Sequence, residues 1–142
     1  MEEKITWDLI DKIIEDIANK INSSNFNIEY IAPIPKGGWI VAALLAQRLN
    51  VKKSISLAQE KSPDGVKTFI ANKLNYENKN VLIVEDSIET GRNLFGAKSE
   101  LAKRGANVKT MALWVIPSFN GNLPDYYFNI GNIPEFPWEI KY

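Results

Sequence analysis

The chain has 142 residues, 45% of them hydrophobic, which predicts a single globular domain with a core of its own. Its formal net charge is zero and no basic or acidic run occurs, so we expect no nucleic-acid partner and no membrane partner. Cys and His are absent, which excludes disulfides, thiolate nucleophiles, Ser-His-Asp triads and zinc sites built on Cys or His.

The N-terminal segment predicts an amphipathic helix rather than a targeting signal. Thr6 is a good N-cap residue, Asp8 follows in the first turn, and isoleucines recur at helical spacing within residues 7–22. The start MEEKITW does not resemble a signal peptide, and no apolar run is long enough to span a membrane. We therefore expect a cytoplasmic protein whose first helix packs on its sheet.

A strand, a turn and a helix come next. Residues 28–34 predict a central strand, and the sequence PIPKGG that ends it is dense in turn-forming residues. Residues 38–49 then carry apolar side chains at helical spacing. Gly37 lets a backbone approach a ligand closely, and Lys36 brings a positive charge to the same turn. Taken alone, a Lys-Gly-Gly turn is common and does not identify a ligand.

The middle of the chain is more polar. Residues 54–58 predict a short strand, and residues 59–67 contain a Pro-Asp-Gly turn signal. Phe69 and Ile70 are expected to begin a return strand, which makes a β-hairpin the simplest interpretation. Residues 72–80 are a polar connector to the next strand.

The stretch VLIVEDSIETGRNL, residues 81–94, carries the clearest pattern in the chain. Residues 81–84 predict a buried strand, the carboxylates Glu85 and Asp86 follow directly, and a short polar turn ends at Gly91. Residues 93–104 then show helical spacing and are followed by Gly105, a suitable residue to end a helix.

A strand, turn and helix in this order form a typical ligand site. Ligands of open α/β sheets bind just past the carboxyl ends of the strands. The helix N-terminus offers free backbone N–H groups and a positive dipole end to a phosphate. Carboxylates in front of it can hold sugar hydroxyls, or Mg²⁺ through water.

The C-terminal part predicts two more strands and an irregular tail. Residues 108–116 form the next buried strand, a loop containing Pro117 follows, and residues 125–130 form a short strand. The tail, NIPEFPWEIKY, is rich in proline and aromatic residues.

Three of these segments together resemble type I phosphoribosyltransferases, and most closely the bacterial xanthine–guanine (purine) enzymes. Residues 81–94 are similar to the motif that binds phosphoribosyl diphosphate (PRPP), and PIPKGG with its helix is similar to the pyrophosphate loop. The closing Pro-Trp-Glu matches the C-terminal end of those enzymes. The resemblance covers roughly residues 26–142.

The resemblance implies one α/β phosphoribosyltransferase domain over residues 1–142. Its fold would be a twisted, mostly parallel five-stranded sheet flanked by helices, with a small C-terminal hood. Residues 59–67 would then be a flexible lid that closes over PRPP and excludes water, which is the alternative to an ordinary hairpin. The resemblance also implies a homodimer or homotetramer.

The implied activity is transfer of the 5-phosphoribosyl group from PRPP to N9 of a 6-oxopurine, with Mg²⁺ as cofactor. Glu85 and Asp86 would bind the ribose hydroxyls and orient the metal, and Glu89 would be the catalytic acid or base. Lys36 and Gly37 would contact the leaving pyrophosphate, with a cis peptide bond between Pro35 and Lys36. The residues expected to contact PRPP or the nucleotide are Lys36, Gly37, Gly38, Glu85, Asp86, Ser87, Ile88, Glu89, Thr90, Gly91, Arg92 and Asn93.

Several positions depart from the family pattern. Glu85 and Glu89 stand where Asp is usual, and Asn93 replaces a usual Thr. In the base pocket, Ile116 stands where a Lys commonly donates to the purine O6, and Ile133 stands where an aromatic ring stacks on the purine. These two residues predict an apolar pocket with relaxed choice among guanine, hypoxanthine and xanthine.

Other interpretations stay open. A regulatory protein that binds PRPP or a nucleotide with little catalysis would tolerate the substitutions at Glu85, Glu89 and Ile116. A structural α/β domain without a ligand would explain each loop separately but not both together. VLIVEDS also resembles the first strand of a two-component receiver domain, but only 56 residues follow Asp86, too few to complete that fold.

Overall fold

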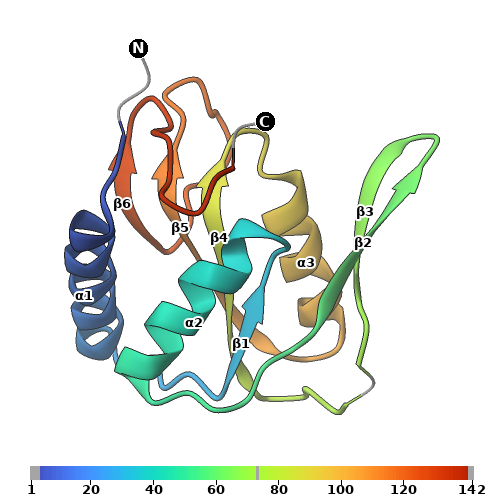
Figure 1. Ribbon diagram of the computed structural model, residues 1–142. Coiled ribbons are helices and arrows are strands. Elements are labelled where there is room, and N and C mark those ends of the chain that lie inside the picture. Colours follow the sequence, from blue (N-terminus) through green and yellow to red (C-terminus); the bar gives the residue numbers. More distant parts are fainter. Residues whose placement is uncertain (1–3, 73, 141–142) are drawn as a thin grey trace.

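The computed structural model describes residues 4–72 and 74–140, and within these residues the chain forms three α-helices and six β-strands (Figure 1). Four strands build the main sheet: β1 (Tyr30–Pro33), β4 (Asn80–Ile88), β5 (Asn107–Val115) and β6 (Tyr126–Ile130). They lie in the order β1-β4-β5-β6, and every neighbouring pair is parallel. The predicted α/β class with a parallel sheet is confirmed.

The main sheet has four strands rather than the expected five. The predicted strand at residues 54–58 contributes only one isolated parallel bridge, between Ile31 and Ser54. The Ile31 N–H donates to the Lys53 carbonyl at 3.0 Å, and the Ile55 N–H donates to the Ile31 carbonyl at 2.9 Å. The chain then leaves the sheet edge because Leu57 begins a different pairing.

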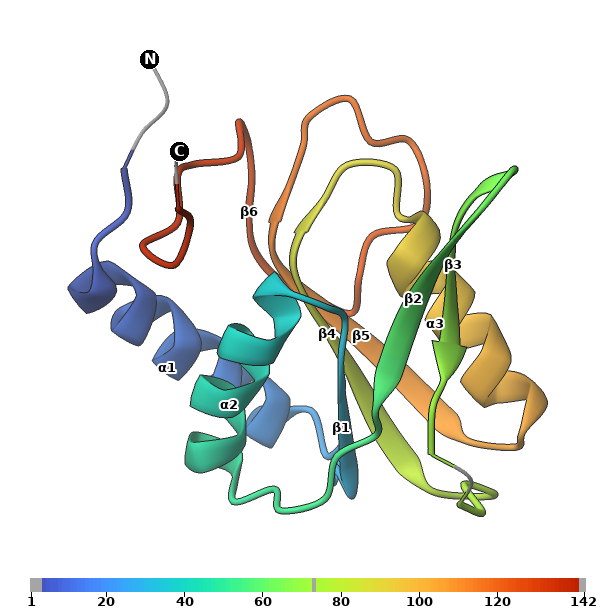
Figure 2. The same ribbon diagram turned by 45° about the vertical axis from the view of Figure 1, so that its right-hand side comes forward.

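That pairing is a separate antiparallel hairpin, in which β2 (Leu57–Ser62) pairs with β3 (Gly65–Ile70). Ser62 lies opposite Gly65, so Pro63 and Asp64 form the connection, as the turn signal predicted. The return strand begins at Gly65, four residues earlier than expected from Phe69–Ile70. Figure 2 shows the hairpin beside the third helix and projecting past the sheet.

Helices cover both faces of the sheet. α1 (Trp7–Ser23) and α2 (Gly37–Leu49) lie on one face, and α3 (Arg92–Lys103) lies on the other with the hairpin (Figure 2). Thr6 caps α1 as predicted, since its hydroxyl accepts the Leu9 N–H at 3.2 Å. The two faces have separate buried clusters, one around the isoleucines of α1 and one around α3. Burial on both sides explains why the strands read as continuous apolar runs.

β4 extends four residues beyond its predicted end. Glu85 and Asp86 were expected on a loop after residue 84, but the strand continues through Ile88. The reason is that β5 still pairs with this segment, up to the pair Ile88 and Val115, after β1 has ended at Pro33. The acid pair therefore stands on a strand with one hydrogen-bonded neighbour and an open side.

The C-terminal segment returns across the sheet to the start of the chain. Phe136 is 1% exposed and belongs to the cluster under α1. The Ile5 N–H donates to the Glu135 carbonyl at 3.0 Å, which ties the two ends of the chain together. No helix in the described ranges is long and apolar enough to cross a membrane.

Candidate active site

Both strand–turn–helix units open at the same edge of the sheet. β1 and β4 are parallel neighbours, so the turn after β1 and the turn after β4 lie side by side. The peptide bond between Pro35 and Lys36 is cis, as predicted. Gly38 is buried against the β4 backbone: a Cβ at this position would lie 2.6 Å from the Val84 carbonyl oxygen. Only glycine permits this close approach of the turn to the β4 backbone.

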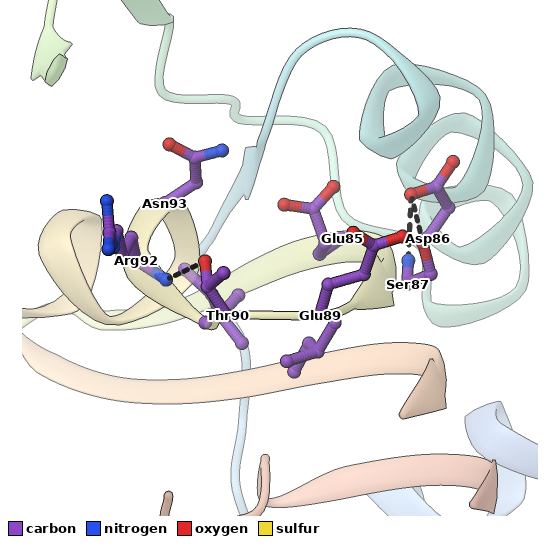
Figure 3. A pocket seen from close by; sticks show the side chains of 10 residues that line it. Glu85, Asp86, Ser87, Glu89, Thr90, Arg92 and Asn93 are labelled. Carbon is purple, nitrogen blue, oxygen red and sulfur yellow. Dashed lines mark hydrogen bonds between the residues drawn. The ribbon is translucent and has the colours of Figure 1, made fainter. Parts of the chain in front are cut away.

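The second turn encloses a pocket of about 270 Å³ (Figure 3). Its lining is the continuous run from the end of β4 to the first turn of α3: Glu85, Asp86, Ser87, Ile88, Glu89, Thr90, Gly91, Arg92, Asn93 and Leu94. Gly91 has a φ of 77°, a left-handed conformation that favours glycine, and this turn directs the chain into the helix. The sequence motif is therefore one physical cavity.

Asp86 joins the two turns. Its Oδ1 accepts the Ser87 N–H at 2.7 Å, and its Oδ2 accepts the indole N–H of Trp138 at 3.4 Å. A Cβ at Gly37 would overlap the Asp86 carboxylate, so the predicted pyrophosphate turn packs directly on this side chain. The carboxylate is thus held from three separate parts of the chain.

Glu85 is half-buried beside Asp86. Burial raises the pKa of Glu85 from its ordinary value of 4.5 to about 9, and the neighbouring Asp86 charge adds to the rise. The side chain is therefore protonated at neutral pH. A cation at this position would favour its ionised form, because an opposite charge lowers the pKa of a carboxyl group.

The N-terminus of α3 is available to an anion. Its first turn contains no acidic residue, and the Arg92 N–H donates to the Thr90 hydroxyl at 3.3 Å. Thr68 of β3, which is buried, donates from its hydroxyl to the Asn93 side chain at 3.4 Å. The hairpin therefore touches the first turn of the helix. In Figure 3 the side chains of Glu85, Glu89 and Asn93 project to the same side of the chain.

The two residues predicted for the base pocket, Ile116 and Ile133, are not among the residues that line this pocket. Ile116 follows β5 and is half-buried, and its N–H donates to the Ile88 carbonyl at 3.1 Å, which ties it to the end of β4. Ile133 packs against the hydrophobic cluster under α1. Contact of either residue with a base stays a prediction.

Two aromatic residues near the site were not predicted from the sequence. Trp138 reaches Asp86 from the C-terminal segment. Phe119, from the loop after β5, stacks on Phe95 of α3 with ring centroids 6.3 Å apart, and both rings lie against Gly91. The Pro-Trp-Glu segment that resembles the family includes Trp138, but no sequence pattern indicated that Trp138 contacts Asp86.

The donor set fits a metal that arrives with its substrate better than a metal held by protein alone. Among the residues that the structure describes, no group of three or more Asp, Glu, His or Cys side chains could hold an ion. The adjacent carboxyl groups of Glu85 and Asp86 open into the pocket. Mg²⁺ commonly binds through one or two carboxylates together with substrate phosphates.

Comparison with known proteins agrees with this geometry. The model of the phosphoribosyl transferase domain matches residues 6–141. The chain is 30% identical to a purine phosphoribosyltransferase from Pyrococcus horikoshii, with a TM-score of 0.78 over 97% of this chain and 94% of that one. A comparison with curated proteins gives no significant match.

Two further structures share the fold. A xanthine-guanine-hypoxanthine phosphoribosyltransferase from Helicobacter pylori has a TM-score of 0.81 at 13% identity, covering 99% of this chain and 95% of that one. A hypoxanthine-guanine phosphoribosyltransferase from Bacillus anthracis has a TM-score of 0.78 at 20% identity, covering 94% and 84%. The family match over nearly the whole chain, together with the site at the end of β4, identifies the protein as a phosphoribosyltransferase.

Proposed function

We propose that the protein transfers the 5-phosphoribosyl group of PRPP to N9 of a 6-oxopurine, giving a nucleoside monophosphate and pyrophosphate. The observation that carries this proposal is the pocket between β4 and α3. It combines a pair of carboxyl groups with a helix N-terminus whose first turn bears no negative charge. A phosphorylated sugar needs these two features together. The similarity to the Pyrococcus horikoshii purine enzyme supports a purine as acceptor.

In this proposal the 5′-phosphate binds at the turn before α3. Its binding groups are the backbone amides of residues 87–92 and the side chains of Thr90 and Asn93, which line the pocket. The left-handed Gly91 directs the chain from this turn into α3. The helix dipole adds attraction for the phosphate charge. Arg92 is exposed at the same turn and contributes its positive charge.

The ribose and Mg²⁺ belong at the end of β4. Glu85 and Asp86 accept hydrogen bonds from the ribose hydroxyls and would hold the metal in common with the substrate. The raised pKa of Glu85 supports this assignment, since burial and the Asp86 charge disfavour a second ionised carboxyl group unless a cation binds beside it. When bound, Mg²⁺ neutralises charge on the diphosphate as it leaves.

The pyrophosphate belongs at the turn after β1. Lys36 is exposed there and its ammonium can approach the leaving group. Gly37 is in contact with Asp86, so the leaving group would lie next to the ribose. Departure of pyrophosphate from C1 gives a transition state with oxocarbenium character, as in glycoside hydrolysis. Catalysis is then mainly positioning and charge stabilisation.

Glu89 is the candidate for proton transfer on the purine. It lies exposed in the turn between β4 and α3, at the mouth of the pocket. Its carboxylate would accept the proton that N9 loses, or would accept a hydrogen bond from that proton when it is on N7 of the purine. The side chain is one methylene longer than the usual Asp, and a misplacement of about one ångström can lower a rate roughly a hundredfold. We therefore expect slow turnover.

Base choice is expected to be relaxed because Ile116 has no side-chain donor for the purine O6. An apolar pocket seldom discriminates by more than about a hundredfold. Rates on guanine, hypoxanthine and xanthine should therefore fall within that range at saturating PRPP and Mg²⁺. In Ile116→Lys, the new ammonium should reach O6 and tighten guanine binding. Activity on a pyrimidine but on no purine would contradict the proposal.

The alternative is a regulator that binds PRPP or a nucleotide and turns over slowly or not at all. The deciding experiment mixes the protein with PRPP, Mg²⁺ and each nucleobase, and measures pyrophosphate and nucleotide. Turnover supports the enzyme. Binding of PRPP in calorimetry without any product supports the regulator, and absence of both overturns the assignment of the pocket.

A further inference from the structure

Trp138 contacts the site from outside the pocket. It lies 52 residues from Asp86 in the chain, and its indole N–H donates to Asp86 Oδ2 at 3.4 Å. The other oxygen, Oδ1, accepts the N–H of Ser87 at 2.7 Å. Each oxygen of this carboxylate therefore has its own donor, and the two donors come from different parts of the chain. Together they restrict rotation of the Asp86 side chain.

The indole itself is held by other rings. Phe136 stacks on Trp138 with centroids 4.7 Å apart and planes inclined by 5°, and Trp7 lies 5.9 Å away at 53°. Phe136 is 1% exposed and packs edge-on to Trp114 at 6.0 Å, so the stack is anchored in the core. Because this packing fixes the ring, the N–H of Trp138 is already directed toward Asp86. Little side-chain entropy of Trp138 is therefore lost when a ligand binds to Asp86.

We propose that Trp138 is a positioning residue for phosphoribosyl transfer, which holds the Asp86 carboxylate in the orientation that accepts the ribose hydroxyls. This inference rests on the proposed function, because it needs PRPP as the ligand of Asp86. Trp138 acts through Asp86 and not by touching the reacting atoms. Its loss should therefore weaken PRPP binding and leave the KM for the base unchanged.

The primary test replaces Trp138 by Phe, which keeps a ring and removes the N–H. The dissociation constant for PRPP with Mg²⁺ should rise about two- to tenfold, the range expected for one hydrogen bond. Trp114→Phe is the matched control: it makes the same change at another ring packed on Phe136, and this ring does not line the pocket. The control should change the melting temperature but not PRPP affinity.

A double-mutant cycle separates positioning from general packing. In an Asp86→Ala background, Trp138→Phe should have no further effect on PRPP affinity, because the group through which it acts is gone. Steady-state kinetics give a second separation: Trp138→Phe should raise the KM for PRPP and leave the KM for the base unchanged. An equal loss of affinity in both backgrounds would overturn the proposal.

A fluorescence measurement serves where Trp138→Phe folds poorly. Trp138 becomes the sole tryptophan when the other three, Trp7, Trp39 and Trp114, are changed to Phe. Its emission should change on addition of PRPP with Mg²⁺, and Asp86→Ala should abolish the change. Emission that does not respond would contradict the inference.

The outcomes distinguish this inference from the function on which it rests. If the parent protein binds and turns over PRPP while Trp138→Phe matches it in affinity and in both KM values, only the positioning role is wrong. If the parent neither binds nor turns over PRPP, the proposed function fails and the positioning role fails with it.

Discussion

The two turns at the site each connect a parallel strand to a helix, but they pack in opposite ways. The turn after β1 is closed: Gly38 lies against the Val84 carbonyl, and Gly37 lies against Asp86. The turn after β4 is open: Glu89 and Thr90 are exposed, and the pocket lies beneath them. Small residues let the first turn settle on the neighbouring strand, whereas longer polar side chains hold the second turn away. Substitutions in the first should therefore affect stability, and substitutions in the second should affect binding and turnover.

The largest effect is expected in the open turn, from Glu89→Gln. Loss of the ionisable group should lower kcat about a hundredfold or more, the usual scale of general acid–base catalysis. PRPP affinity should stay nearly unchanged, because the proposed role of Glu89 is proton transfer on the base. Steady-state kinetics and calorimetry on the same preparation check both parts. Glu100→Gln is the control: Glu100 lies in α3, outside the pocket lining, and forms a surface ion pair with Lys103. Equal turnover in Glu89→Gln and the parent would remove Glu89 from the mechanism.

Asp86→Asn tests the residue that joins the two turns. Removing the charge should weaken PRPP binding with Mg²⁺ about ten- to a hundredfold, since a hydrogen bond to a charged group is worth roughly 1.5–3 kcal/mol. Calorimetry measures this directly. Because Asp86 stands in β4 and bonds to Ser87 and Trp138, a modest fall in melting temperature should accompany the change. Unchanged affinity would show that the ribose binds elsewhere.

Gly38→Ala tests the closed turn. The added methyl would meet the Val84 carbonyl at 2.6 Å, so the turn must move, and we expect a loss of about 1–3 kcal/mol in unfolding free energy. Gly96→Ala is the matched control in α3, where a Cβ meets no atom within 4 Å. It should gain roughly 0.5–1 kcal/mol from helix propensity. Urea unfolding measures both, and equal stability of the two variants would contradict the difference drawn between the turns.

The fourth test concerns the pH dependence of stability contributed by Glu85. Folding raises the pKa of this carboxyl group from 4.5 to about 9, so the folded chain keeps a proton that the unfolded chain releases. Stability from this group is present at low pH and falls as pH rises from about 4.5 toward 9. Glu85→Gln should remove that decline. Urea unfolding of parent and variant at several pH values in this range measures it, and parallel curves would show that burial does not control this group.

Most of the fold could be predicted from residue patterns, because these patterns act over short stretches of sequence. The three helices, β5 and the start of β4 were predicted within one residue of their observed bounds, since apolar spacing and capping residues such as Thr6 act within a few positions. The end of β4 was misjudged because it depends on pairing with β5, which carries no local signal. The predicted fifth strand at residues 54–58 was reduced to a bridge because Leu57 pairs within the hairpin instead.

The candidate site also has a part that local sequence predicted and a part that depends on long-range contacts. The residues from Glu85 to Asn93 were predicted together and do line one pocket, because they are continuous in sequence. The contacts that converge on Asp86 from Gly37 and Trp138 were not foreseen, because they join distant segments. Tyr76 is a further example: it lies in a connector that reads as polar, yet its ring is 1% exposed beside Tyr30.

The separation of the β2–β3 hairpin from the main sheet has a consequence for amide hydrogen exchange. The tip, residues 59–67, is exposed on every side chain, while Thr68 and Ile70 at its base are buried. The hairpin shares no hydrogen-bonded ladder with β1-β4-β5-β6 within the described residues. Its tip can therefore open without breaking any bond of that sheet, and local openings of this kind need far less free energy than global unfolding. Amides at the tip should exchange in the native state, while those of β4 and β5 exchange only when the whole chain unfolds.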